Sequence, residues 1–398
     1  MVTEHELRLA LDHRVPEGEQ ITVFAREVAD PDGADRPLLL FLQGGPGFEA
    51  PRPTRHPTSP GWLGRALQEY RVLMLDQRGT GRSSPVSAAA LAGRTPAEQA
   101  SYLTNFRADA IVRDAEAFRM HLGSAPWSVL GQSFGGFTTL AYLSQSPAGL
   151  REAMFTGGLA PIGRHPDEVY QATYARVLER NGRYYARYPE DRERFLAARE
   201  TAPVLASGDR LSHARLRQVG HRLGSSDGAE RVHAILELAP DSPAFAHDVD
   251  AIGFARNPIY AILHESSYAD GHATGWSARR TLPAVYADDP TLMTGEHVYP
   301  WMFEEINALV PLREAADLLA EHEWPRLYDP VVLAGNEVPA AAAIYTDDMY
   351  VERAFSEETA AHVRGLRPWV TSEYEHNGLR ADGERILDRL IALVRGRR

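Results

Sequence analysis

One serine stands between two glycines in the segment VLGQSFGGFTTLAYL, residues 129–143. Gly131 to Gly135 match the pattern G-x-S-x-G, in which the serine occupies a sharp turn between a strand and a helix. An apolar run at residues 127–132 predicts a buried strand before the motif, and a helix-like run follows it. These flanks make Ser133 the candidate nucleophile of an acyl-transfer reaction.

A second match to the same pattern runs from Gly224 to Gly228 in the polar segment RLGSSDGAER. The nucleophile turn requires a strand before the serine, and none is predicted here. Ser226 is therefore interpreted as a loop residue.

A serine hydroxyl needs a base to take its proton, and histidine titrates in the required range. Of the fifteen histidines, His376 is best placed, because it follows the last strand-like run and precedes the final helix. A carboxylate must orient that base, and it is expected after the preceding strand. Asp347 and Asp348 both stand there, and the residue pattern does not choose between them.

The attack would create an oxyanion, which prealigned backbone N–H groups stabilise. One donor is expected from Phe134, directly after the serine, and another from the glycine-rich loop QGGPG at residues 43–47. In the next such loop, residues 76–85, Arg78 either pairs with Asp76 beside the site or is a surface arginine.

The elements that must position these residues alternate between strand and helix patterns. Strands are predicted at residues 21–29, 36–43, 70–77, 127–132, 151–159, 338–346 and 367–375, with helices at 108–123, 356–366 and 381–396. This alternation predicts a mainly parallel sheet wound by right-handed crossovers. From about residue 160 to 325 the pattern is mostly helical. We therefore expect an α/β catalytic domain at 1–159 and 326–398, interrupted by a helical cap domain at 160–325.

The composition excludes several classes of partner. The 398 residues carry a formal net charge of −12, which argues against a nucleic-acid or anionic-membrane partner. There is no cysteine, and neither a signal peptide nor a membrane-spanning run is visible. A cytoplasmic location is expected. No H-E-x-x-H or similar motif indicates a metal site. The oligomeric state is left open.

The motifs FLQGGPG, DQRGTGRSSP and GQSFGGF, in this order, resemble those of the proline iminopeptidases (prolyl aminopeptidases). These are serine peptidases of the α/β-hydrolase fold, whose cap is inserted after the sixth strand. The resemblance implies Ser133 as nucleophile and His376 as base, and it favours Asp348, which precedes an apolar residue, over Asp347. It also implies Gly45 and Phe134 as the oxyanion donors. Gln43 departs from the family pattern, in which many members have histidine.

The same resemblance implies that glutamates of the cap bind the free amine of the substrate. The segments YAILHESSY and TGEHVYPWMFEE indicate Glu265 and Glu296, with Glu304 in reserve. The implied substrate is a peptide or small amide with a free N-terminal proline, and the reaction needs no cofactor. Aromatic residues for a proline pocket are available at Phe137, Tyr299, Trp301 and Phe303, but none is assigned.

Two other functions are compatible with parts of this pattern. The first is another α/β-hydrolase activity, such as an esterase, an amidase or an aminopeptidase of different specificity, with the same Ser133, Asp348 and His376. The second is a binding protein without catalysis on the same scaffold, which the complete set of three residues disfavours.

Overall fold

The computed structural model describes residues 1–123 and 125–397. Its centre is an eight-stranded sheet in the order β1-β2-β6-β3-β7-β8-β9-β10. The strands are β1 (Val2–Ala10), β2 (Gln20–Val28), β3 (Leu38–Leu42), β6 (Arg71–Asp76), β7 (Trp127–Gln132), β8 (Leu150–Thr156), β9 (Ala340–Tyr345) and β10 (Leu366–Thr371). The pairs from β6 to β10 are parallel, whereas β2 runs antiparallel to both β1 and β6. The predicted α/β class with a mainly parallel sheet is confirmed.

The helices that accompany this sheet lie before β8 and after β9 in the chain. They are η1 (Pro31–Gly33), α1 (Leu63–Leu67), α2 (Ala88–Leu91), α3 (Pro96–Leu103), η2 (Thr104–Phe106), α4 (Ala108–His121), α5 (Phe134–Gln145), η3 (Pro147–Gly149), α17 (Arg353–His362), α18 (Gly378–Ala381) and α19 (Gly383–Val394). A small hairpin of β4 (Thr54–Arg55) and β5 (Thr58–Ser59) stands apart from the large sheet.

The two faces of the sheet bury different sets of residues. Successive side chains of a strand point to opposite faces. Accordingly, Leu39 and Phe41 of β3 belong to the core beneath α1 and α19, whereas Leu40 and Leu42 belong to the core shared with α4 and α5. All five residues of β3 are buried, as a strand covered on both faces requires. The loops at the carboxyl ends of these strands carry the candidate site.

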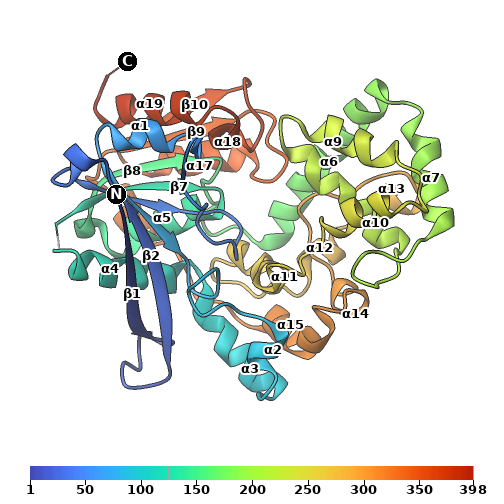
Figure 1. Ribbon diagram of the computed structural model, residues 1–398, viewed down its shortest axis with the longest axis horizontal. Coiled ribbons are helices and arrows are strands. Elements are labelled where there is room, and N and C mark those ends of the chain that lie inside the picture. Colours follow the sequence, from blue (N-terminus) through green and yellow to red (C-terminus); the bar gives the residue numbers. More distant parts are fainter. Residues whose placement is uncertain (124, 398) are drawn as a thin grey trace.

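The named elements between β8 and β9 are all helices, joined by loops, and β8 is the sixth strand of the large sheet along the chain. Its elements are α6 (Pro166–Arg187), α7 (Asp191–Thr201), α8 (His213–Arg217), η4 (Gln218–Gly224), α9 (Gly228–Leu236), α10 (Pro243–Asp250), α11 (Pro258–Leu263), η5 (Glu265–Tyr268), α12 (Ser277–Arg280), α13 (Val285–Asp288), α14 (Met302–Glu305), η6 (Val310–Leu312), α15 (Arg313–Glu321) and α16 (Pro330–Ala334). Figure 1 shows α6, α7, α9 and α10 in green and yellow, grouped beside the layered sheet and helices. Helix α15 packs against α3.

Strand β1 was not predicted from the sequence. Its residues alternate between exposed and half-buried positions at the edge of the sheet, because only one face of this strand is covered. Within the described residues, no helix is both long enough and apolar enough to cross a membrane.

Candidate active site

Ser133 occupies the turn between β7 and α5. Its backbone has φ 54° and ψ −122°, a conformation that residues with a side chain rarely adopt and that costs on the order of 1–3 kcal/mol. The main-chain N–H of Ser133 donates to the oxygen of Thr156 at the end of β8, across 3.0 Å. Gln132 and Phe134 are buried, whereas Ser133 is partly exposed. The turn therefore leaves the serine as its accessible residue.

The glycines around Ser133 are required by close packing. A Cβ atom at Gly135 would lie 2.0 Å from the main-chain oxygen of Leu42, and one at Gly131 would lie 2.3 Å from the oxygen of Gly135. Both separations are far below van der Waals contact. Glycine thus allows α5 to begin directly against β3 and β7.

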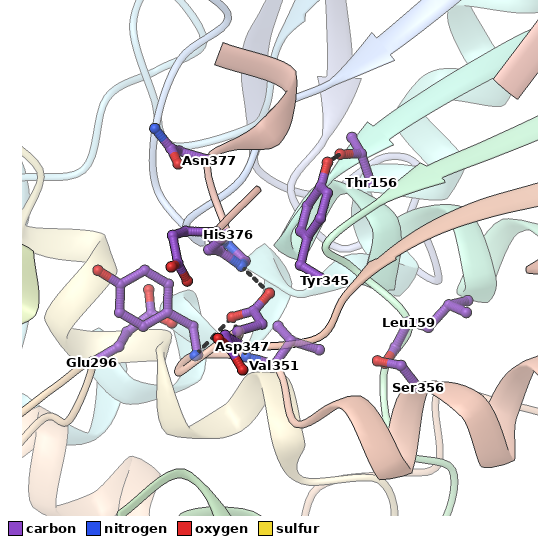
Figure 2. Close-up of polar contacts among 12 residues, drawn as sticks. Thr156, Leu159, Glu296, Tyr345, Asp347, Val351, Ser356, His376 and Asn377 are labelled. Carbon is purple, nitrogen blue, oxygen red and sulfur yellow. Dashed lines mark hydrogen bonds and ion pairs between the residues drawn. The ribbon is translucent and has the colours of Figure 1, made fainter. Parts of the chain in front are cut away.

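The histidine predicted from the sequence contacts one of the two candidate acids. His376 Nδ1 lies 2.7 Å from Asp348 Oδ2, and the two residues stand on the loops that follow β10 and β9 (Figure 2). The second carboxylate oxygen of Asp348 accepts the N–H groups of Tyr350, at 2.8 Å, and Val351, at 3.0 Å. These bonds fix the carboxylate, so that it can hold the imidazole in one orientation.

The neighbouring Asp347 has a different partner. Its carboxylate accepts a hydrogen bond of 2.7 Å from Arg183, and this bond keeps the pKa of Asp347 below its usual value. Of the two acids that the residue pattern left open, the geometry joins only Asp348 to His376.

Burial and charge act in opposite directions on His376. Its burial disfavours the imidazolium and lowers the pKa, but the charge of Asp348 and the hydrogen bond that His376 donates to it outweigh burial. The pKa of His376 is therefore raised above its ordinary value. The charge of Glu296 acts in the same direction.

Ser133 and His376 both lie beside the end of β8. The N–H of Ser133 donates to Thr156, and the next residue is Gly157, where a Cβ atom would lie 3.2 Å from His376 Nδ1. The main chain at Thr156 and Gly157 thus contacts both residues. The sheet brings the candidate nucleophile and the candidate base, 243 positions apart in sequence, to one edge.

The glycine-rich loop after β3 lies against the serine. A Cβ atom at Gly44 would be 2.9 Å from Ser133 Cβ and 3.5 Å from its Oγ. The side-chain amide of Gln77 donates to the oxygen of Gln43 at 2.8 Å and holds the start of this loop. Gly45 follows with φ 135°, a conformation that favours glycine. Phe134 is the first residue of α5, so its N–H has no acceptor within the helix.

Glu296 lies among the side chains of Tyr260, His264 and His221, and its charge acts on His376, which Figure 2 draws near it. The hydroxyl of Tyr260 donates to its Oε1, and the Nε2 atoms of His264 and His221 lie 3.6 Å and 3.9 Å from its carboxylate oxygens. Burial alone would raise the pKa of Glu296, but the two histidines outweigh it and hold the pKa well below the usual value. Glu296 is therefore a buried carboxylate that stays ionised.

The other two glutamates have different surroundings. Glu265 is buried, and its Oε1 accepts the N–H of Ala278 at 2.8 Å. Within the described part of the chain its Oε2 has no hydrogen-bond partner. Burial raises the pKa of Glu265. Glu304 is exposed and pairs with Arg313 at 2.8 Å, which places it on the outer surface.

Sequence reasoning missed three residues of this site. The ring of Tyr350 packs edge-on against His376, with centroids 4.8 Å apart, and Tyr350 stands only two positions after Asp348. Tyr260 is one helical turn before His264, a spacing that could have indicated a shared face. His221 carries no such signal, because its contact with Glu296 spans 75 positions of the chain.

The aromatic residues that were considered but not assigned lie in two places. Phe137 packs against Tyr268, with centroids 5.6 Å apart, and lies close to Phe134. Tyr299 instead shares a hydrogen bond of 2.7 Å with the hydroxyl of Tyr174, and it stacks on Trp301. Phe303 packs against Trp276. Phe137 alone among the four is thus connected to the turn that carries the serine.

The suggested partner of Arg78 was wrong. Arg78 is fully buried and forms two hydrogen bonds with Asp114, at 2.6 Å and 2.7 Å. Asp76 instead accepts the main-chain N–H groups of Ala50 and Arg82. Arg78 therefore ties the loop at residues 76–85 to Asp114 of α4 rather than pairing with a residue of that loop.

Ser226, a loop residue between η4 and α9, donates from its N–H and its hydroxyl to the side-chain oxygen of Asn377, next to His376.

Glu190, Asp191 and His233 could offer three ligand atoms to a metal ion. However, the carboxylate of Asp191 already accepts from Tyr184, Arg194 and His233. The positive charge of the Arg194 guanidinium beside Asp191 disfavours the binding of a metal cation there.

The known proteins most similar to this chain include several proline iminopeptidases. Residues 37–322 match the family model for the alpha/beta hydrolase fold. A proline iminopeptidase of Aeromonas sobria is 50% identical over 98% of this chain and 96% of its own length. A proline iminopeptidase of Aspergillus aculeatus is 35% identical over 99% of this chain and 94% of its own length. A probable proline iminopeptidase of Streptomyces coelicolor is 29% identical over 65% of this chain and 72% of its own length. The chain therefore belongs to the proline iminopeptidase family of α/β-hydrolases.

Proposed function

We propose that this protein is a serine aminopeptidase that releases proline from the N-terminus of peptides and small amides. The observation that carries the substrate assignment is the ionised, buried carboxylate of Glu296 beside His376. An N-terminal proline is a secondary ammonium at neutral pH and pairs with such a carboxylate, whereas an acylated proline has no charge to pair.

The first half of the reaction forms an acyl-enzyme. Ser133 Oγ attacks the prolyl carbonyl carbon while His376 takes the hydroxyl proton, and Asp348 stabilises the imidazolium that results. The N–H groups of Gly45 and Phe134 hold the oxyanion, each contributing about 3 kcal/mol to the transition state. The carbon–nitrogen bond then breaks, His376 gives its proton to the leaving amine, and a prolyl ester remains on Ser133.

The second half hydrolyses that ester. His376 takes a proton from water, the oxygen of the water attacks the ester carbonyl, and the same donors hold the second oxyanion. The bond to Ser133 breaks, His376 returns the proton to Ser133 Oγ, and free proline leaves. In total, the hydrolysis of one amide bond consumes one water molecule and requires no cofactor.

Amine recognition is assigned to Glu296 and, with a smaller share, to Glu265. Glu296 carries full charge because two histidines favour its ionised form. In the described part of the chain, Glu265 has an oxygen without a hydrogen-bond partner, but burial raises its pKa. The same proposal divides the chain into a catalytic domain, residues 1–159 and 326–398, and a cap domain, 160–325, which supplies both glutamates. The negative net charge favours small peptides over nucleic acid or anionic membranes as partners.

The decisive experiment compares prolyl-p-nitroanilide with its N-acetylated form, in the wild type and in the variant Glu296→Gln. We expect the wild type to prefer the free amine. In Glu296→Gln the kcat/KM for the free amine should fall by roughly 10- to 150-fold, the range for a lost hydrogen bond to a charged group. Glu265→Gln should cost less. Preference of the wild type for the acetylated substrate would instead support a different amidase or esterase that uses Ser133, Asp348 and His376.

Glu304→Gln is the matched control, because Glu304 is exposed and paired with Arg313 outside the site. Its kcat/KM should equal that of the wild type. A fluorophosphonate probe gives an independent check of the serine. Folded wild type should be labelled and Ser133→Ala should not, and unlabelled wild type would favour a binding protein over an enzyme.

A further inference from the structure

Arg180 of α6 contacts both of the loops that carry the proposed acid and the proposed base. Its Nη2 donates a hydrogen bond of 2.7 Å to the main-chain oxygen of Asp347, the residue directly before Asp348. The same nitrogen pairs with the carboxylate of Glu375, the residue directly before His376. One guanidinium therefore joins the loop after β9 to the loop after β10, at the positions next to Asp348 and His376.

The contacts of Arg180 are partly shielded from water. Its side chain is 15% exposed, and that of Glu375 is 21% exposed. Burial and the nearby charge of Arg183 lower the pKa of Arg180, whereas the charges of Asp347 and Asp348 act in the opposite direction. An arginine in a protein nevertheless stays protonated. Hydrogen bonds that involve a charged group are stronger than neutral ones, and the partial exclusion of water strengthens them further.

The helix that carries Arg180 is itself fixed at this turn. The next residue, Asn181, is buried, and its side-chain amide donates to the main-chain oxygen of Met293 at 2.9 Å and accepts the N–H of Met293 at 2.8 Å. Val177 and Tyr184 of the same helix are buried in the hydrophobic core. Arg180 therefore extends from a rigid backbone, so its guanidinium can restrain the two loops instead of following their motion.

A second arginine of α6 provides a comparison within the same helix. Arg183 donates to the side chain of Asp347 at 2.7 Å, but the side chains of this pair are 58% and 38% exposed. Exposed ion pairs contribute little to stability. The bond involves the side chain of Asp347 rather than its main chain, and it leaves the loop after β10 untouched. Arg183 thus shares the helix, the charge and one partner residue of Arg180, but it does not link the two loops.

We propose that Arg180 is a positioning residue, which holds the loop of Asp348 and the loop of His376 at the separation that their hydrogen bond requires. A displacement of about 1 Å in a catalytic group can cost about 100-fold in rate, so such a restraint acts on turnover rather than on substrate binding. The segment between β8 and β9, which supplies Glu296, then also takes part in aligning the base. This inference rests on the proposed roles of Asp348 and His376, but not on proline as the substrate.

The experiment compares Arg180→Met with the matched control Arg183→Met. Two rates are measured, the turnover of prolyl-p-nitroanilide and the labelling by a fluorophosphonate, which needs the activated serine but no amine site. In Arg180→Met, kcat should fall by roughly 10- to 100-fold while KM changes by less than about threefold, and labelling should slow by a similar factor. In Arg183→Met both rates should stay within about twofold of the wild type. A loss in KM alone, or equal losses in the two variants, would overturn the positioning role.

Glu375→Gln tests the link to the loop of the base. It removes the charge that Arg180 binds, so kcat should fall by at least about threefold. The double variant Arg180→Met/Glu375→Gln should be no slower than Arg180→Met alone, because the two residues act through one contact. Losses that multiply would contradict this. Should Arg180→Met fail to fold, Glu375→Gln decides alone, and an unchanged kcat would refute the link.

A spectroscopic signature separates alignment from stability. The proton between His376 Nδ1 and Asp348 Oδ2 should give a far-downfield resonance in the proton NMR spectrum at a pH where His376 is protonated. This resonance should be lost in folded Arg180→Met and kept in Arg183→Met, and an unchanged resonance in Arg180→Met would refute the proposal. A wild type that is labelled but prefers acetylated proline would instead contradict the aminopeptidase function alone, so the two failures are distinguishable.

Discussion

The side-chain amide of Asn257 donates a hydrogen bond of 2.8 Å to the main-chain oxygen of Gly47. Asn257 stands directly before α11, and Gly47 ends the glycine-rich loop that is proposed to supply an oxyanion donor. One turn further along the same helix, Tyr260 donates to Glu296. A single helix therefore contacts both the loop at the reacting carbonyl and the carboxylate proposed for the amine.

This relationship predicts that Asn257 positions the oxyanion loop although it does not touch the substrate. Asn257→Ala removes one hydrogen bond, which is commonly worth about 0.5–1.5 kcal/mol. The value of kcat for prolyl-p-nitroanilide should fall by roughly 2- to 12-fold with little change in KM. Steady-state kinetics on the folded variant measure both constants.

Asn105→Ala is the control for this change. Asn105 also donates its amide to main-chain oxygens, those of Ser101 and Tyr102, but it does so outside the proposed oxyanion loop. It should leave kcat unchanged. Equal losses in both variants, or a loss in Asn257→Ala that appears only in KM, would argue against a positioning role.

The two adjacent aspartates allow a paired test of the acid. Asp348→Asn leaves the shape of the site but removes the charge that holds His376, and kcat should fall by about 10³- to 10⁴-fold. Asp347→Asn removes only the bond to Arg183 and should keep kcat within about twofold of the wild type. Rates that fall together in the two variants, or that fall more in Asp347→Asn, would reassign the acid. Kinetics with prolyl-p-nitroanilide distinguish these outcomes.

The pH dependence of kcat/KM should report the raised pKa of His376. A general base acts only when neutral, so activity is lost as the pH falls through the pKa of the histidine in the folded enzyme. Because Asp348 raises that pKa, the midpoint should lie above the ordinary histidine value of about 6.5.

The charge of Glu296 also raises the pKa of His376, so Glu296→Gln should move this midpoint to lower pH. Glu304→Gln should not move it. The profile is best measured on whatever activity the variants retain, with the midpoint rather than the rate as the readout. A midpoint that is unchanged or higher in Glu296→Gln would contradict the electrostatic coupling between Glu296 and His376.

The parts of the site that could be predicted from the sequence are those with local signals. Ser133 carries its glycines within two positions on either side, and His376 and the aspartates directly follow apolar strand-like runs. Because parallel strands end at one edge of a sheet, the positions after such runs converge. The edge strand β1 escaped prediction because its covered residues are only half-buried and its sequence is rich in charge.

The missing parts depend on contacts between distant segments. Tyr260 and His221 reach Glu296 across 36 and 75 positions of chain, and no periodicity within either segment encodes that meeting. For Arg78, the sequence suggested a local partner where the true partner is distant. Asp76 is close to it in sequence, but the buried partner is Asp114, which only the packing of α4 against the sheet makes available.

The tight packing of the nucleophile turn leads to a last prediction, on stability. A Cβ atom at Gly135 would lie 2.0 Å from the oxygen of Leu42, which is fixed main chain, so Gly135→Ala should displace α5 from β3. We expect a loss of at least about 2 kcal/mol in the free energy of unfolding, in the range of overpacked cores, together with loss of activity. Gly182→Ala is the matched change in α6, where a Cβ atom has no neighbour within 4 Å, and it should stabilise the fold by about 0.5–1 kcal/mol through helix propensity. Urea unfolding of both variants measures the two free energies. A Gly135→Ala variant as stable as Gly182→Ala would show that α5 can move away from β3 without cost. The close packing of α5 against β3 would then not be what fixes the position of Ser133.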